Sequence, residues 1–166
     1  NSTTTSERLR CAEAMARSCD TYFYEVGYRF YLSGDGGRSR MQEWAQTFGF
    51  GTIPWSPLAG GLLSGKYHRG EAPPDDSRFA HMDANPMYRR RLNDNMWDVI
   101  EGIENLAAEK EVSMSQFSLA WVMARGPEIV PIPGCKTRAH LEDNLRAMEI
   151  ELKKEDLARL DALMPP

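Results

Sequence analysis

Two glycine-rich junctions hold the residues that could do chemistry in this sequence of 166 residues. The first runs from Trp55 to Lys66 and reads WSPLAGGLLSGK, and the second runs from Ile132 to Thr137 and reads IPGCKT. In parallel α/β folds, ligands collect where a strand ends and the next helix presents unpaired N–H groups. Glycines let a ligand approach the backbone and lysines supply positive charge. Each junction therefore predicts a site for an anionic group.

The residue types suggest how each junction would hold an anion. In the first, two serines offer donors and Lys66 offers charge; in the second, Gly134 exposes backbone amides, Thr137 can cap a helix and Lys136 places a positive charge at its start. The alternative for both is a tight turn with a solvated lysine. Neither junction has the spacing of a Walker loop or of the G-x-G-x-x-G fingerprint, so a bound phosphate would be held by another arrangement.

The pattern of apolar residues predicts the elements that position these junctions. We expect helices at 6–17, 41–48, 86–110, 113–124 and 137–148, a last amphipathic helical segment at 157–163, and strands at 22–32, 51–55 and 129–132. Gly49 is expected to end the 41–48 helix in a left-handed conformation, and Ser113 with Gln116 forms a capping box. A long excursion over 68–86 is typical of a functional loop. Alternating helices and strands predict an α/β fold of parallel strands with helical crossovers.

Composition excludes several classes of partner. The net charge of −4 lacks the basic footprint of a nucleic-acid binder, and no apolar stretch approaches the roughly 18 residues that span a membrane. The three cysteines, Cys11, Cys19 and Cys135, are an odd number without C-x-x-C spacing. We therefore expect no disulfide framework and no metal site, and we predict reduced thiols in a cytoplasmic protein.

Two longer motifs carry a family resemblance. IPWSPLAGGLLSGKY, from Ile53 to Tyr67, resembles the cofactor-loop signature of the aldo-keto reductases, particularly the branch that includes potassium-channel β subunits. IPGCKTRAHLEDNL, from Ile132 to Leu145, resembles the second cofactor signature of that family, and SMSQFSLAWVMAR between them also fits. The likeness covers 41–164 strongly and 1–40 weakly. We treat 1–166 as one domain, the C-terminal part of the family's barrel.

The resemblance implies a (β/α)8 TIM barrel that reduces aldehydes or ketones with NADPH, of which this chain would form the C-terminal half. It also implies cofactor-binding roles for many residues of this sequence. Those expected to wrap the pyrophosphate are Trp55, Ser56, Pro57, Leu58, Ala59, Gly60, Ser64 and Lys66, with Arg78 closing over the cofactor. Those expected at the adenosine end are Gly134, Lys136, His140, Asp143 and Asn144, with Lys136 beside the 2′-phosphate.

The sequence departs from the family pattern in its first part. No segment reproduces the motifs of the family's Asp, Tyr, Lys and His tetrad, so we assign no catalytic residue. The glutamine that usually bonds the nicotinamide carboxamide is replaced by Gly27, or by Glu25 under a shifted alignment. A non-catalytic nucleotide-binding or interaction module is therefore the alternative function. A third reading is a chain adapted to another reaction, using Asp20, Tyr28 or His140.

The length bears on the same question. A closed (β/α)8 barrel takes about 250 residues, and three or four strands cannot close one. The chain would then be a fragment of a longer enzyme, a natural truncated homologue, or a chain completed by another copy. An open half-barrel leaves unpaired strand edges, which predicts a homo-oligomer for a chain that stands alone.

Overall fold

The computed structural model describes residues 40–80 and 92–163. The helix predicted at 6–17, the strand predicted at 22–32 and the positions Glu25 and Gly27 lie outside the described residues. The chain divides into two compact units, 1–52 and 53–166, and each is described by itself. In the described residues, no helix has both the length and the apolar character needed to cross a membrane.

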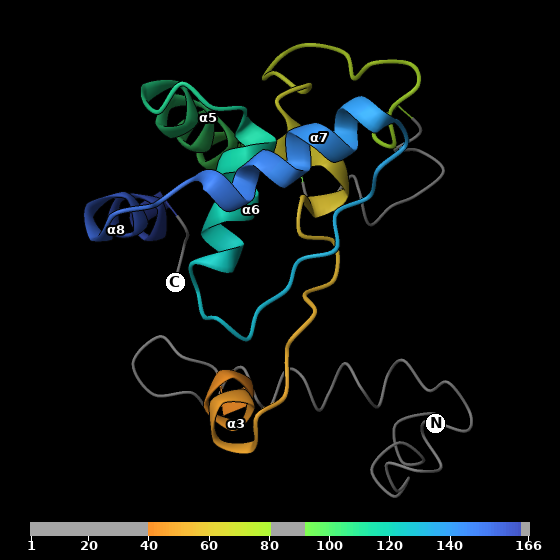
Figure 1. Cartoon of the computed structure of the whole chain (residues 1–166). Helices are drawn as coiled ribbons and strands as arrows, with labels where there is room; N and C mark the ends of the chain where they lie inside the picture. The colour runs from red at the N-terminus through yellow and green to blue at the C-terminus, as the bar shows by residue number, and fades with distance from the viewer. Residues whose placement is uncertain (1–39, 81–91, 164–166) are drawn as a thin grey trace, which may run out of the picture. The chain divides into compact units, whose positions relative to one another are not determined.

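The first unit contains helix α3, Arg40–Phe48 (Figure 1). Its end confirms the prediction for Gly49, which adopts φ +70° and donates its N–H to the Ala45 carbonyl at 2.9 Å. Ala45 is buried, whereas Trp44 and Phe48 are exposed and meet edge to face with ring centroids 6.2 Å apart. Only one residue of the predicted apolar face of this helix is thus shown to be buried.

The second unit is a cluster of helices around α6, Met114–Met123 (Figure 1). Helix α6 packs against α5, Asp94–Glu109, and against α7, Arg138–Arg146. It also contacts the short 3-10 turns η2, Ala59–Ser64, and η4, Ala147–Glu149. Helix α8, Lys154–Leu163, packs on α5. The central position of α6 places it next to both predicted cofactor junctions.

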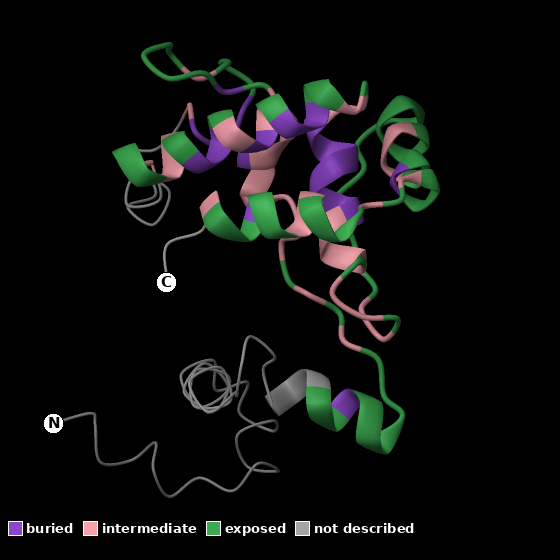
Figure 2. Cartoon of the chain, turned by 90° about the vertical axis from the view of Figure 1, so that its left-hand side faces the viewer, coloured by how far each residue is buried: buried purple, intermediate pink, exposed green. Residues whose placement is uncertain are grey.

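The core of this unit forms between α5 and α6 (Figure 2). All residues from 114 to 120 are buried, which is typical of a helix covered on every side rather than on one face. Phe117 of α6 packs in one cluster with Ile100 and Ile103 of α5 and Leu160 of α8. Burying each such side chain contributes about 1.5–3 kcal/mol, so this cluster holds the helices in place.

Capping side chains set where the helices begin. The Ser113 hydroxyl accepts from Gln116 N while the Gln116 side chain accepts from Ser113 N, which confirms the capping box. The Thr137 hydroxyl accepts from His140 N at 3.2 Å, as predicted. Of the helix predicted at 86–110, positions 86–91 lie outside the described residues. The described helix α5 begins at Asp94, because Asn93 caps it by accepting from Met96 N at 2.9 Å.

The predicted strands are not confirmed. Within 40–80 and 92–163, strand-type pairing is limited to single bridge residues, Thr52 and Ile129. Pro54 and Pro131 remove N–H donors from the two short apolar runs, which limits the ladders they can form. The described residues are therefore mostly helical, and they do not show a partial barrel of parallel strands.

One side of α7 carries an exposed apolar face. Leu141 and Leu145 of α7 and Met148 of the following η4 turn continue this face and follow the predicted helical spacing, yet their exposed fractions are 46%, 48% and 68%. Ile53 and Ile132, in the two runs expected as strands, are each 63% exposed. The periodicity was predictive of the helix itself but not of the burial of its apolar face.

The described part of the excursion, 68–80, is tied to α5 by charge. The Arg69 guanidinium bonds Glu101 through Nε at 2.7 Å, bonds Asp98, and lies 3.8 Å from an Asp94 oxygen. Phe79 is fully buried. This part of the excursion is therefore attached to the helical unit at two points.

Candidate cofactor-binding loops

The first junction forms a turn with an unusual run of left-handed residues. Gly60, Gly61 and Gly65 have positive φ, and so do Ser56 at 54° and Ala59 at 50°. Residues other than glycine rarely adopt this region. Such conformations cost of order 1–3 kcal/mol each and cluster where a ligand is bound. The turn from Ser56 to Gly65 thus has the backbone character of a functional loop.

Internal hydrogen bonds hold that turn. Ser56 Oγ accepts from Gly60 N at 2.9 Å, and the Ser56 carbonyl accepts from Ala59 N at 2.8 Å. Ser64 Oγ donates to the Gly61 carbonyl at 2.6 Å. The two serines predicted to meet the pyrophosphate therefore also shape the loop that would receive it.

Lys66 and Tyr67 lie against Gly61 of this turn. A β-carbon built on Gly61 would lie 3.6 Å from Lys66 Nζ and 3.9 Å from Tyr67 Oη, so both groups lie against this glycine. Lys66 is exposed and its Nζ is 5.3 Å from the centre of the Tyr67 ring. Tyr67 is buried, and within the described residues its hydroxyl has no hydrogen-bond partner. An exposed ammonium and an unsatisfied hydroxyl beside one turn suit an anionic ligand.

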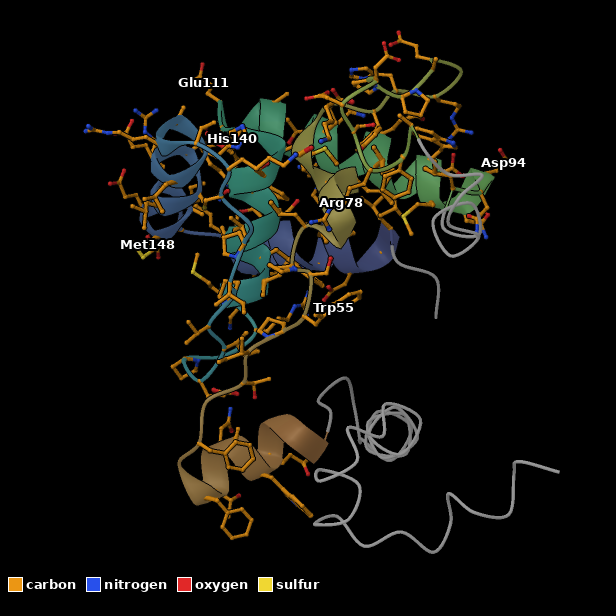
Figure 3. The ribbon with its side chains drawn as sticks, turned by 90° about the vertical axis from the view of Figure 1, so that its right-hand side faces the viewer. Trp55, Arg78, Asp94, Glu111, His140 and Met148 are labelled. Carbon is orange, nitrogen blue, oxygen red and sulfur yellow. The ribbon has the colours of Figure 1, made fainter. Side chains whose placement is uncertain are left out.

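The remaining residues predicted for this loop lie around it. Trp55 is 79% exposed, Pro57 and Leu58 are half-buried, and Arg78 is exposed. In the view of Figure 3, Arg78 is drawn over the η2 turn and Trp55 below it. Their roles toward the pyrophosphate remain predictions.

The second junction is exposed and leads into the N-terminus of α7. Gly134 and Lys136 are exposed, and a β-carbon on Gly134 would meet nothing within 4 Å. Asn144 Nδ2 lies 3.2 Å from Cys135 Sγ, which ties the loop back to α7. His140 is exposed on the first turn of α7 (Figure 3). A lysine at a helix N-terminus is a favourable place for a phosphate group.

Asp143 accepts two hydrogen bonds from residues at the start of α6. Its Oδ2 accepts from Ser113 Oγ at 3.1 Å, and its Oδ1 accepts from Gln116 Nε2 at 2.6 Å. Sequence reasoning placed Asp143 at the adenosine end but missed these two partners. The capping box was visible in the sequence; its bonds to Asp143 span about thirty residues, and no local pattern reports such a contact.

Both junctions meet the same end of α6. A β-carbon on Gly65, at the end of the first turn, would lie 3.7 Å from the Met114 β-carbon. Ser113, the residue before Met114, bonds Asp143 of α7, the helix that follows the second junction and whose Asn144 contacts Cys135 of that junction. The structure thus attaches the two predicted loops to one helix start, although they lie far apart in the sequence.

A separate cavity lies under the excursion. Its volume is about 260 Å³. Tyr67 borders it as well as the first turn. The residues that line it are Tyr67, His68, Gly70, Glu71, Pro73, Leu92 and Trp97.

Comparison with known proteins identifies the family. The model of the aldo/keto reductase family matches residues 2–165. The chain belongs to the aldo/keto reductase family. Among similar proteins is probable aldo-keto reductase 1 of Glycine max, 32% identical over 117 residues, which are 70% of this chain and 33% of that protein.

Other relatives of this aldo/keto reductase chain differ in description. A probable voltage-gated potassium channel subunit beta of Arabidopsis thaliana is 33% identical over 61% of this chain and 31% of its own length. The aldo-keto reductase yakc [NADP(+)] of Schizosaccharomyces pombe is 32% identical over 60% of this chain and 28% of its own length. The chain spans about a third of the length of the curated relatives it matches.

Proposed function

We propose that this chain supplies the NADP(H)-binding loops of an oxidoreductase that reduces aldehydes or ketones to alcohols. The observation that carries the proposal is the attachment of two loops, each with an exposed lysine, to one end of α6. Family membership and a relative described with NADP(+) support the choice of cofactor. When bound, the cofactor supplies the hydride that reduces the carbonyl group.

Different residues of the chain would bind different parts of the cofactor. The turn from Ser56 to Gly60 and the Lys66 ammonium would hold the pyrophosphate, with Arg78 closing over it. Lys136 would pair with the 2′-phosphate at the start of α7, and Asn144 would contact the adenosine. Support comes from the left-handed turn, the exposed lysines and the helix start.

The remainder of the enzyme would be supplied from outside these residues. We propose that the runs at 51–55 and 129–132 become parallel strands of a (β/α)8 barrel when the rest of the barrel is present. The proton donor and its lysine would come from that part. A chain acting alone would cover its exposed α7 face with a second copy. Its substrate would be a small carbonyl compound, and we place the protein in the cytoplasm.

Titration of the protein's intrinsic fluorescence with NADPH and with NADH tests the cofactor assignment. Loss of a hydrogen bond between a lysine and a phosphate costs about 1.5–3 kcal/mol, which is about a 10–100-fold loss of affinity. We expect Lys136→Met to weaken NADPH binding by this factor and to leave NADH binding nearly unchanged. Lys154→Met, an exposed lysine at the start of α8, is the matched control. Absence of binding of either nucleotide to the wild-type chain would contradict the proposal.

A turnover assay separates the two candidate functions. The second candidate, a non-catalytic nucleotide-binding module, is favoured by the relative described as a potassium channel subunit beta. We expect carbonyl reduction when the missing part of the barrel is added to the chain. Binding of NADPH with no turnover of any aldehyde or ketone in that mixture would favour the module instead.

A further inference from the structure

The start of α6 holds Asp143 through two donors. Gln116 Nε2 donates to Asp143 Oδ1 at 2.6 Å and Ser113 Oγ donates to Oδ2 at 3.1 Å. All three side chains are half-buried or buried, so water screens these bonds little. Each oxygen of a carboxylate can accept two hydrogen bonds, and these donors use one position on each. Among the residues that the structure describes, Asp143 therefore keeps one acceptor position on each oxygen for a ligand.

The direction of the Gln116 amide is fixed by chemistry. Its Oε1 accepts from Ser113 N at 3.1 Å, and a backbone N–H can only donate. The NH2 group then faces Asp143 and donates to its Oδ1. Ser113 is fixed in the same way, because its oxygen accepts from Gln116 N and its proton is left for Asp143. Ser113, which caps α6, and Gln116 in its first turn thus both donate to the Asp143 carboxyl group.

This arrangement connects both cofactor loops. Asp143 lies on α7 beside Asn144, which contacts Cys135 in the second loop. Met114, between the two donors in the sequence, packs on Gly65 at the end of the first turn. A substitution at the start of α6 is therefore expected to shift the second loop through Asp143 and the first turn through Met114.

We propose that Ser113 and Gln116 are positioning residues for the adenosine end of the cofactor. They hold Asp143 so that its remaining acceptor positions face a hydrogen-bond donor of the adenosine. This inference rests on the proposed function and deepens it. Neither residue belongs to the set predicted to contact the cofactor.

Gln116→Glu separates positioning from capping. Glutamate is an ordinary capping-box residue, so its carboxylate still accepts from Ser113 N. Its second oxygen, however, faces Asp143 in place of the donor. The probes are adenosine 2′,5′-bisphosphate, which lacks the nicotinamide end, and reduced nicotinamide mononucleotide, which lacks the adenosine end. We expect about a tenfold weaker affinity for the first probe and a change below twofold for the second.

Two further variants control for general effects. Ser118→Ala alters a buried hydroxyl of the same helix that has no partner among the described residues, and it should change neither affinity. Adding Asp143→Asn to Gln116→Glu reverses donor and acceptor, because the asparagine NH2 can donate to the glutamate. That double variant should recover part of the lost affinity for adenosine 2′,5′-bisphosphate, and its melting temperature should return toward that of the wild type.

The outcomes distinguish the two proposals. A wild-type chain that binds neither probe nor NADPH would overturn the proposed function and this inference with it. A wild-type chain that binds, with Gln116→Glu binding adenosine 2′,5′-bisphosphate equally well, would overturn only the inference. An equal loss for both probes would assign Gln116 a general structural role and overturn positioning.

Discussion

Replacing Gly61 by alanine tests whether the left-handed turn is required. Gly61 has φ +103° and ψ 2°, a conformation that residues with a side chain rarely adopt. The new β-carbon would lie 3.5 Å from Lys66 Cε, an ordinary van der Waals contact, so steric overlap adds little. Backbone strain then sets the cost, which is about 1–3 kcal/mol.

The expected effect on stability follows from the size of the chain. Gly61 lies in the unit 53–166, and in a domain of that size 1 kcal/mol shifts the melting temperature by about 4 °C. We therefore expect Gly61→Ala to melt about 4–12 °C lower than the wild type, as measured by circular dichroism. Any relaxation of the strain would reshape the turn, so NADPH affinity should fall in the same variant.

Gly134→Ala is the matched control for that measurement. Gly134 lies outside the left-handed region, and a β-carbon there meets nothing within 4 Å. Its substitution should change stability by no more than about 0.5 kcal/mol. If Gly61→Ala were as stable as Gly134→Ala, the argument from backbone strain would be refuted.

Two further predictions concern the contacts that hold the helices together. The Lys110 ammonium lies 2.8 Å from an Asp156 oxygen, and this hydrogen bond holds the pKa of Asp156 below its usual value of 3.8. The stabilisation is therefore complete above about pH 4 and is lost as the pH falls through the lowered pKa. We expect Asp156→Asn to unfold at lower urea concentration at pH 7 and to approach the wild type in acid; a constant difference across the titration would contradict this. Arg69→Met removes the bonds from the excursion to α5, and we expect faster hydrogen exchange over 68–80 with unchanged exchange in α6, measured by mass spectrometry.

Local signals in the sequence predicted local structure. The capping box at Ser113, the cap at Thr137 and the left-handed Gly49 were all predicted, because each depends on residues within one turn of one another. The family resemblance implied that the two loops hold one cofactor, but their attachment to the start of α6 was not predicted, since it depends on contacts between distant segments. Gln116 shows this best: its cap was predicted and its bond to Asp143 was not.

The same reasoning explains why the predicted strands were not confirmed and why the predicted burial failed. A strand needs partners that supply hydrogen bonds, and an apolar face needs a surface to cover it; neither is encoded in the segment itself. Ile53 and Ile132 have the apolar side chains expected of strands, yet both are exposed. The apolar face that includes Leu141 and Leu145 of α7 is exposed as well. The resemblance to the family came from two motifs and needed no prediction of packing; the match of the family model to residues 2–165 then confirmed it.

The hydrogen bonds inside the turn from Ser56 to Gly65 have a kinetic consequence. Because the chain has already met the entropic cost of ordering this segment, a nucleotide need not induce its shape. We therefore expect association to follow a single exponential whose rate rises linearly with nucleotide concentration. A rate that reached a plateau would indicate that the turn rearranges before or after the encounter.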